Sequence, residues 1–152
     1  MQVPDAIRKC VAFLGCRTAD GEIHIGGTVF FIAKPAGNTG KNFSYAVTAA
    51  HCLLEIDKLQ TREVLIRLNL KDGSSRWIET DIGSWPLHPL DQTVDVAACP
   101  VSLPLEADHV VFPIEGFANE KFFTANQIGV GDEVFFLAYL GRTREKGGTS
   151  RL

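Results

Sequence analysis

The chain has 152 residues, 45% of them hydrophobic, with 18 acidic and 15 basic side chains and a net charge of −3. This composition suits one folded domain with a sizeable core and excludes a disordered chain. The charges are interleaved, so a nucleic-acid partner is not expected, and no apolar run approaches the length of a membrane span.

The first half of the chain predicts short strands separated by turns. Residues 7–15 and 22–34 have strand-like composition on either side of the turn TADG, and residues 43–49 follow a loop rich in glycine and asparagine. In EVLIRLNL, residues 63–70, apolar and polar side chains alternate, as is typical of a half-buried strand. The turn KDGSS and the segment RWIETDI extend this strand into a predicted hairpin over residues 63–82.

One short helix and one buried strand are predicted beside these strands. HCLLEIDKL, residues 51–59, is the helical candidate, and TVDVAACPV, residues 93–101, is a short apolar run that predicts a buried strand. Many short strands with glycine and proline turns, without a long amphipathic helix, indicate an all-β barrel or sandwich.

The last part of the chain has a looser pattern. Residues 102–127 mix proline, charges and isolated aromatic side chains, which predicts a connecting segment that wraps a surface. GVGDEVFFLAYLG, residues 129–141, predicts a strand that is apolar on both faces and needs partners on both sides. We therefore expect a first unit at residues 1–118, and at residues 119–152 a linker with the opening strand of an incomplete second unit. The unpaired strand at residues 133–140 is expected to favour self-association.

The four cysteines are predicted to be reduced, small and buried apolar residues. On one strand, Cys10 and Cys16 would lie about 20 Å apart at roughly 3.3 Å per residue. A disulfide needs Cα atoms within about 7 Å. The N-terminus lacks an apolar core followed by a cleavage site, so no secretory signal is predicted and a cytoplasmic location is expected.

The stretch YAVTAAHC, residues 45–52, places His51 after three small residues at the end of an apolar strand. Neutral imidazole is a common general base, and a carboxylate on its second nitrogen fixes its tautomer. Asp95 lies in an apolar run, so its carboxylate is expected to be largely buried and to need a partner, for which His51 is the natural candidate. Taken singly, each residue also has an ordinary structural interpretation as a strand-end or turn residue.

Together the two motifs have a more specific meaning. VTAAHC resembles the histidine motif of trypsin-like serine peptidases, DVAAC resembles the aspartate motif of that family, and their order and separation are similar too. GGTVFFIA, residues 26–33, is similar to the strand before the histidine, and GVGDEVFFLAYLG is similar to the opening strand of the second barrel in bacterial-type members. The resemblance covers residues from about 7 to 141.

The resemblance implies a chymotrypsin-like fold of two six-stranded antiparallel β-barrels with the active site between them. His51 would be the general base and Asp95 its orienting partner, while the nucleophilic serine would lie in a Gly-x-Ser-Gly turn of the second barrel. The chain is then expected to be the N-terminal part of a serine endopeptidase with a peptide or protein substrate and no cofactor or metal ion, inactive alone. The alternative is a non-catalytic, peptidase-like β-barrel that acts as a binding or regulatory module.

The sequence departs from the family pattern in three places. It contains no GDSGG-like motif, and Ser150 in GTS, near the end of the chain, is expected to be a solvated tail residue. The position that pairs with the cysteine after the histidine in extracellular members is Ile25 here, so Cys52 is predicted to be a free thiol. No IVGG-like start is present, so zymogen cleavage is not indicated.

His88 and Asp91 in PLHPLDQ form the main alternative site. With His51 they could suggest a metal site, but zinc ligands prefer tighter and more regular spacing. The prolines around His88 predict a loop, so His88 is expected to brace that loop, and Asp91 is the second candidate for the orienting carboxylate. His24 and His109 have no supporting context.

Overall fold

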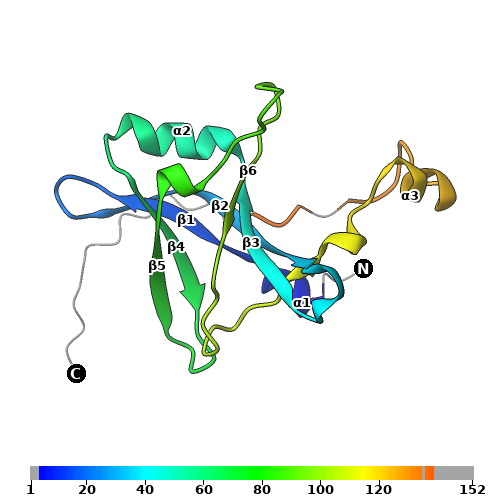
Figure 1. Ribbon diagram of the computed structural model, residues 1–152, viewed down its shortest axis with the longest axis horizontal. Helices are drawn as coiled ribbons and strands as arrows, with labels where there is room; N and C mark the ends of the chain where they lie inside the picture. The colour runs from blue at the N-terminus through cyan, green and yellow to red at the C-terminus, as the bar shows by residue number, and fades with distance from the viewer. Residues whose placement is uncertain (1–3, 135, 139–152) are drawn as a thin grey trace.

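The computed structural model describes residues 4–134 and 136–138, and within them the chain is built mostly from antiparallel strands (Figure 1). The strands are β1 (Val11–Arg17), β2 (Ile23–Pro35), β3 (Asn42–Thr48), β4 (Glu63–Asn69), β5 (Ser75–Asp81), β6 (Ala97–Pro100) and β7 (Phe112–Pro113). The α-helices are α1 (Asp5–Arg8), α2 (Ala50–Lys58) and α3 (Glu120–Ala125), and single 3-10 turns lie at Gly37–Thr39, Ile82–Ser84 and Ile114–Gly116. The predicted all-β class is confirmed.

The strands form one curled sheet, shaped like half a barrel, in the order β5-β4-β1-β2-β3-β6 (Figure 1). The pairs along this order are antiparallel, and short β7 adds a parallel pairing with Ile32 and Ala33 of β2. The predicted hairpin over residues 63–82 is confirmed as β4 and β5, and the predicted helix over residues 51–59 as α2, which begins one residue earlier.

The core is built from side chains of the central strands. Leu14 of β1, Phe31 of β2 and Ile66 of β4 are at most 1% exposed. Burial does not follow a strict alternation, since Leu65 next to Ile66 is also fully buried. Helix α2 adds Leu53 and Ile56 to the same cluster. Full burial of a side chain of this size contributes about 1.5–3 kcal/mol, so the apolar face of α2 fixes the helix against the sheet.

Gly15 marks an irregularity between β1 and β2. The pairing register shifts between Leu14 and Gly15, where the backbone of β2 comes very close. A methyl group at Gly15 would overlap the carbonyl oxygen of His24 and lie 3.3 Å from the Cα of Ile25. Glycine is therefore required here by the close approach of two strands.

Two predicted strands begin later than expected. Ile7 and Arg8 lie in α1, where Asp5 and Arg8 form an ion pair at the favourable ends of the helix dipole, and β1 starts only at Val11. The strand predicted over residues 93–101 is reduced to β6, because Asp95 is drawn to the start of α2 instead of pairing in the sheet.

The strand predicted over residues 129–141 is wrong for the residues that the structure describes. Residues 129–134 and 136–138 have no regular secondary structure, and Val134 and Phe136 are 71% and 93% exposed. Residues 135 and 139–141, and Ser150, lie outside the described part of the chain. The predicted division at residue 118 stays a prediction.

None of the helices in the described part of the chain has the length and apolar character needed to cross a lipid bilayer.

Candidate functional site

His51 is held at the junction between β3 and α2. Strand β3 ends at Thr48, Ala49 is extended with φ of −70° and ψ of 134°, and the helix begins at Ala50. Thr48 and Ala50 are 4% and 7% exposed. Small side chains here allow the chain to turn directly from the sheet into the helix, which leaves His51 on the surface at the second helical position.

Strand pairing brings Asp95 to the same junction. In the register of β3 with β6, Thr48 lies opposite Ala97, so the chain just before β6 passes beside the start of α2. Asp95 lies two residues before Ala97 and therefore reaches His51, although 44 residues separate the two in the chain. Figure 1 shows this segment descending from the loop beside the N-terminal end of α2.

The carboxylate of Asp95 contacts His51 at two points. Its Oδ1 accepts a hydrogen bond from the backbone N–H of His51 at 2.8 Å, and its Oδ2 lies 2.5 Å from the imidazole Nδ1. The N-cap residue Ala49 has no side-chain acceptor, so Asp95 supplies the acceptor that the first turn of α2 lacks. The structure thus brings the two predicted residues together, while their catalytic role stays a prediction.

These contacts lower the pKa of the Asp95 carboxyl below its usual value of 3.8. The backbone N–H of His51 is the largest cause, followed by the hydrogen bond to the imidazole. An ionised carboxylate only accepts hydrogen bonds, so the proton of the neutral imidazole lies on Nδ1 and leaves Nε2 as the basic nitrogen. The pair is therefore in the tautomer that a general base requires.

Asp95 is more exposed than the sequence indicated. The expectation of a largely buried carboxylate is wrong, since the Asp95 side chain is 53% exposed and that of His51 is 66% exposed. Val96 is itself 46% exposed, so the apolar neighbours of Asp95 do not form a buried strand. Because both side chains are open to solvent, a hydroxyl group or a water molecule can approach the pair.

The imidazole Nε2 of His51 makes no hydrogen bond within the described residues, where the ring bonds to Asp95 through Nδ1. No serine of residues 4–134 contacts the ring by a hydrogen bond. The free nitrogen can accept a proton from a hydroxyl or from water that is brought to it.

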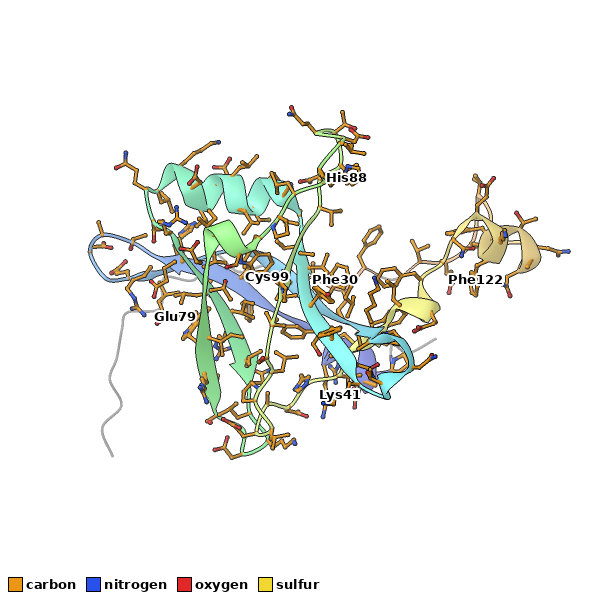
Figure 2. The ribbon with its side chains drawn as sticks, in the orientation of Figure 1. Phe30, Lys41, Glu79, His88, Cys99 and Phe122 are labelled. Carbon is orange, nitrogen blue, oxygen red and sulfur yellow. The ribbon has the colours of Figure 1, made fainter. Side chains whose placement is uncertain are left out.

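Asp91 and His88 form a separate, local arrangement. The Oδ1 of Asp91 accepts hydrogen bonds from the backbone N–H and hydroxyl of Thr93 at 2.9 and 2.6 Å, and the Nδ1 of His88 accepts the backbone N–H of Asp91 at 2.9 Å. His88 lies high in the loop above the sheet (Figure 2). The prediction that His88 braces its loop is confirmed, and the structure gives Asp91 a partner other than His51.

The remaining histidines lie away from this pair. His24 is exposed in β2 opposite Cys16, and His109 packs edge-on to Phe31, with its Nδ1 3.2 Å from the carbonyl oxygen of Ala107. Within the described residues, no three histidine, cysteine, aspartate or glutamate side chains gather as a metal site would require.

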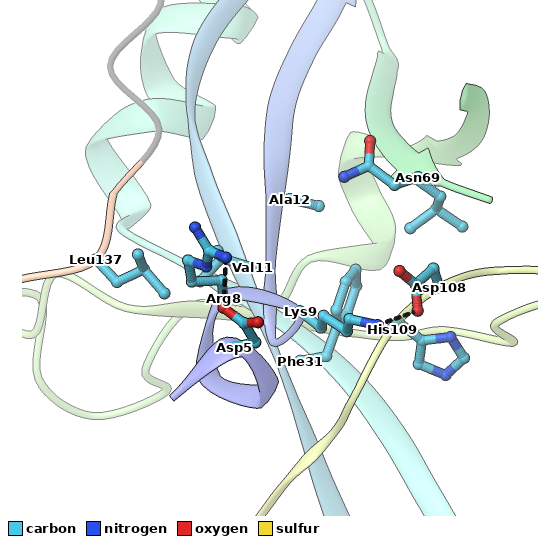
Figure 3. Close-up of a pocket in the computed structure, with 11 residues that line it drawn as sticks. Asp5, Arg8, Lys9, Val11, Ala12, Phe31, Asn69, Asp108, His109 and Leu137 are labelled. Carbon is cyan, nitrogen blue, oxygen red and sulfur yellow. Dashed lines mark hydrogen bonds and ion pairs between the residues drawn. The ribbon is translucent and has the colours of Figure 1, made fainter. Parts of the chain in front are cut away.

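A pocket of about 360 Å³ lies beside α1, where no sequence pattern predicted a site (Figure 3). Its floor includes Phe31, and its rim carries two ion pairs, Lys9 with Asp108 at 2.7 Å and Arg8 with Asp5. The charged groups at the rim already have partners, and the pocket includes neither member of the His51–Asp95 pair.

The four cysteines are free thiols, as predicted. Burial raises the pKa of the thiols of Cys10, Cys16 and Cys99, and it is also the largest cause of the raised pKa of Cys52. Ile25, which stands where the resemblance implies the partner of a Cys52 disulfide in extracellular members, is 5% exposed and belongs to the buried apolar residues.

Comparison of the chain with protein-family models, with curated proteins and with solved structures found no match. The geometry of the His51–Asp95 pair is therefore the basis for a functional conclusion.

Proposed function

We propose that His51 and Asp95 are the general base and the orienting carboxylate of a trypsin-like serine endopeptidase, and that this chain supplies the N-terminal part of that enzyme. The observation that carries the proposal is the two-point contact of Asp95 with the backbone N–H and the Nδ1 of His51. The contact fixes the ring and its tautomer and leaves Nε2 open toward solvent.

In the proposed reaction, a serine hydroxyl approaches Nε2 of His51. The ring accepts the hydroxyl proton while the serine oxygen bonds to the carbonyl carbon of the substrate peptide. Asp95 stabilises the imidazolium that forms, and Nε2 then returns the proton to the leaving amine as the C–N bond breaks. Water releases the acyl group by the same steps in reverse.

The curled antiparallel sheet supports the assignment of residues 1–118 to the first barrel of a chymotrypsin-like fold. In such a fold the nucleophile and the oxyanion hole belong to a second barrel, which faces the exposed edge of the histidine. The exposure of His51 and Asp95 is compatible with a cleft that only the second barrel completes.

The test uses the chain joined to the continuation of its reading frame. A fluorophosphonate probe bonds to a serine only when a neighbouring base activates that serine. We expect labelling at a Gly-x-Ser-Gly turn in the continuation, and loss of labelling by a factor of about 10³ or more in His51→Ala, because the members of such a triad act as a unit.

His88→Ala is the matched control, since it removes an exposed histidine from a nearby loop. We expect it to leave labelling within about twofold of the wild type. Equal labelling of the His51→Ala protein would overturn the proposal.

The second candidate function is a non-catalytic binding or regulatory module built on the same sheet. A reading frame that continues without a Gly-x-Ser-Gly turn would support this candidate over the peptidase.

A further inference from the structure

Gly27 of β2 lies directly against Cys52, the residue that follows His51 in the first turn of α2. A methyl group at Gly27 would lie 2.9 Å from Sγ and 3.3 Å from Cβ of Cys52, closer than ordinary van der Waals contact. The thiol therefore occupies the space that a side chain on the strand would need. Glycine in a strand interior often marks such a close approach.

Thr48, the last residue of β3, ties the end of this strand to β2 next to Gly27. Thr48 is 4% exposed, and its hydroxyl donates a hydrogen bond to the carbonyl oxygen of Thr28 at 2.8 Å. The chain that leads into α2 is thus fixed to the same strand that Cys52 contacts.

The position of this turn determines whether His51 reaches Asp95. The backbone N–H and the Nδ1 of His51 must both meet one carboxylate, at 2.8 and 2.5 Å, and a hydrogen bond weakens steeply beyond about 3.2 Å or at poor angles. A shift of the turn by a fraction of an ångström changes both contacts together.

We propose that Gly27 is a positioning residue for the His51–Asp95 pair and acts through Cys52, which sets the height of the first turn of α2 above β2. The catalytic consequence of this role rests on the proposed function, but the positioning itself does not. The geometric claim can therefore be tested on this chain without any nucleophile.

The test follows the Nδ1–H proton of His51 by NMR in protein with ¹⁵N-labelled histidine. In the wild type, we expect the hydrogen bond to Asp95 to slow the exchange of this proton and to shift its resonance downfield. We expect the resonance to broaden or disappear in Gly27→Ala. Gly26→Ala is the matched control, since the nearest atom to a methyl group there is 3.9 Å away, and it should keep the resonance.

A second substitution tests whether the effect passes through Cys52. In Gly27→Ala/Cys52→Ala the Sγ is gone and the nearest remaining Cys52 atom is the Cβ at 3.3 Å, so the resonance should return. Cys52→Ala alone should keep it. If Gly27→Ala does not fold, Cys52→Val is examined instead: its added methyl group crowds Gly27 from the helix side and should increase the exchange rate of the same proton.

An unchanged resonance in folded Gly27→Ala, or in Cys52→Val if the glycine variant does not fold, would overturn the proposal. A lost resonance that the double substitution does not restore would also overturn it. If instead the NMR results hold but the fluorophosphonate probe labels no serine in the extended chain, the positioning role stands and the peptidase function fails.

Discussion

Asp95 holds His51 by its backbone and by its ring, with one carboxylate oxygen for each. The same side chain therefore caps helix α2 and sets the tautomer of the imidazole. Substitutions at this position can separate the two roles, because the cap needs only an acceptor, whereas the ring contact needs an acceptor that faces Nδ1.

Asp95→Asn should retain the cap and lose the orientation of the ring. The amide oxygen of asparagine can accept the N–H of His51, but the amide nitrogen is a donor and cannot accept from Nδ1–H. We expect the ¹⁵N shifts of His51 to move toward the other tautomer while the helical circular dichroism is unchanged. Asp91→Asn is the control and should alter neither signal. An Asp95→Asn protein that keeps the wild-type ¹⁵N shifts would contradict this account.

Ionised Asp95 should stabilise the folded chain less as the pH falls. The pKa of Asp95 is lower in the folded chain than in the unfolded chain, chiefly because of the hydrogen bond from the backbone N–H of His51. The stabilisation by Asp95 is therefore complete above the unfolded pKa and is lost as the pH falls through the folded pKa. Urea unfolding of wild type and Asp95→Ala should therefore differ most at neutral to mildly acidic pH. The difference should shrink below about pH 4.

The pKa values of Asp72, Asp81 and Asp91 are lowered too, so both proteins lose stability in acid and only their difference reports on Asp95. A difference that grows as the pH falls below 4 would contradict the assignment.

Gly15→Ala should destabilise the sheet far more than Gly26→Ala. The methyl group at Gly15 would meet the backbone of His24 and Ile25, which cannot move without disturbing β2. We expect a loss of about 1–3 kcal/mol or more in the free energy of unfolding, measured by urea denaturation. At Gly26, where a methyl group has space, the change should be within about 1 kcal/mol. Equal effects at the two glycines would show that the bulge can relax.

Thiol reactivity should distinguish Cys52 from the other three cysteines. Denatured, unreduced protein should react at all four thiols, since all four are free. In the folded protein we expect Cys52 to react first, because it is half-buried whereas the others are buried, although its raised pKa keeps it slower than a free cysteine. Mass spectrometry of partly labelled protein identifies the site. Finding only two reactive thiols after denaturation would mean that a disulfide forms.

Self-association should depend on the apolar residues after α3. Phe136 is 93% exposed, so Phe136→Lys should lower the apparent mass in light scattering if residues 133–140 pair with another chain. Leu105→Lys is the matched control, since Leu105 is 90% exposed elsewhere on the molecule. A wild-type chain that is monomeric at high concentration would disprove the predicted association.

Local patterns in the sequence were sufficient to predict much of the sheet. The alternation in residues 63–70 and the turn that follows were enough to predict the hairpin of β4 and β5. The short apolar strand and the three small residues before His51 were enough to predict, to within one residue, where α2 begins. The contact between His51 and Asp95 was also predictable, because the two motifs are informative as a pair.

Other features depend on long-range packing, which the sequence does not display. The apolar neighbours of Asp95 suggested that its carboxylate is buried. Asp95 instead caps helix α2, which lies far from it in the sequence, and its side chain stays half-exposed. The contact of Gly27 with Cys52 joins a strand to a helix. In the sequence, only the two adjacent glycines of β2 indicated that another part of the chain comes close there. Residues 129–141 have strand composition, but residues 129–134 and 136–138, the part that the structure describes, pair with no strand there.

Helix α2 is capped by Asp95, a residue far along the sequence, and this has a consequence for the order of folding. The helix has nine residues and begins with alanines that offer it no side-chain acceptor, so it is too short to be stable as an isolated segment. Its missing acceptor, Asp95, arrives only when β6 pairs with β3. During synthesis, residues 50–58 therefore emerge well before the group that completes their first turn. The N-terminal end of α2, and His51 with it, should become ordered late, after the hairpins of the sheet have formed.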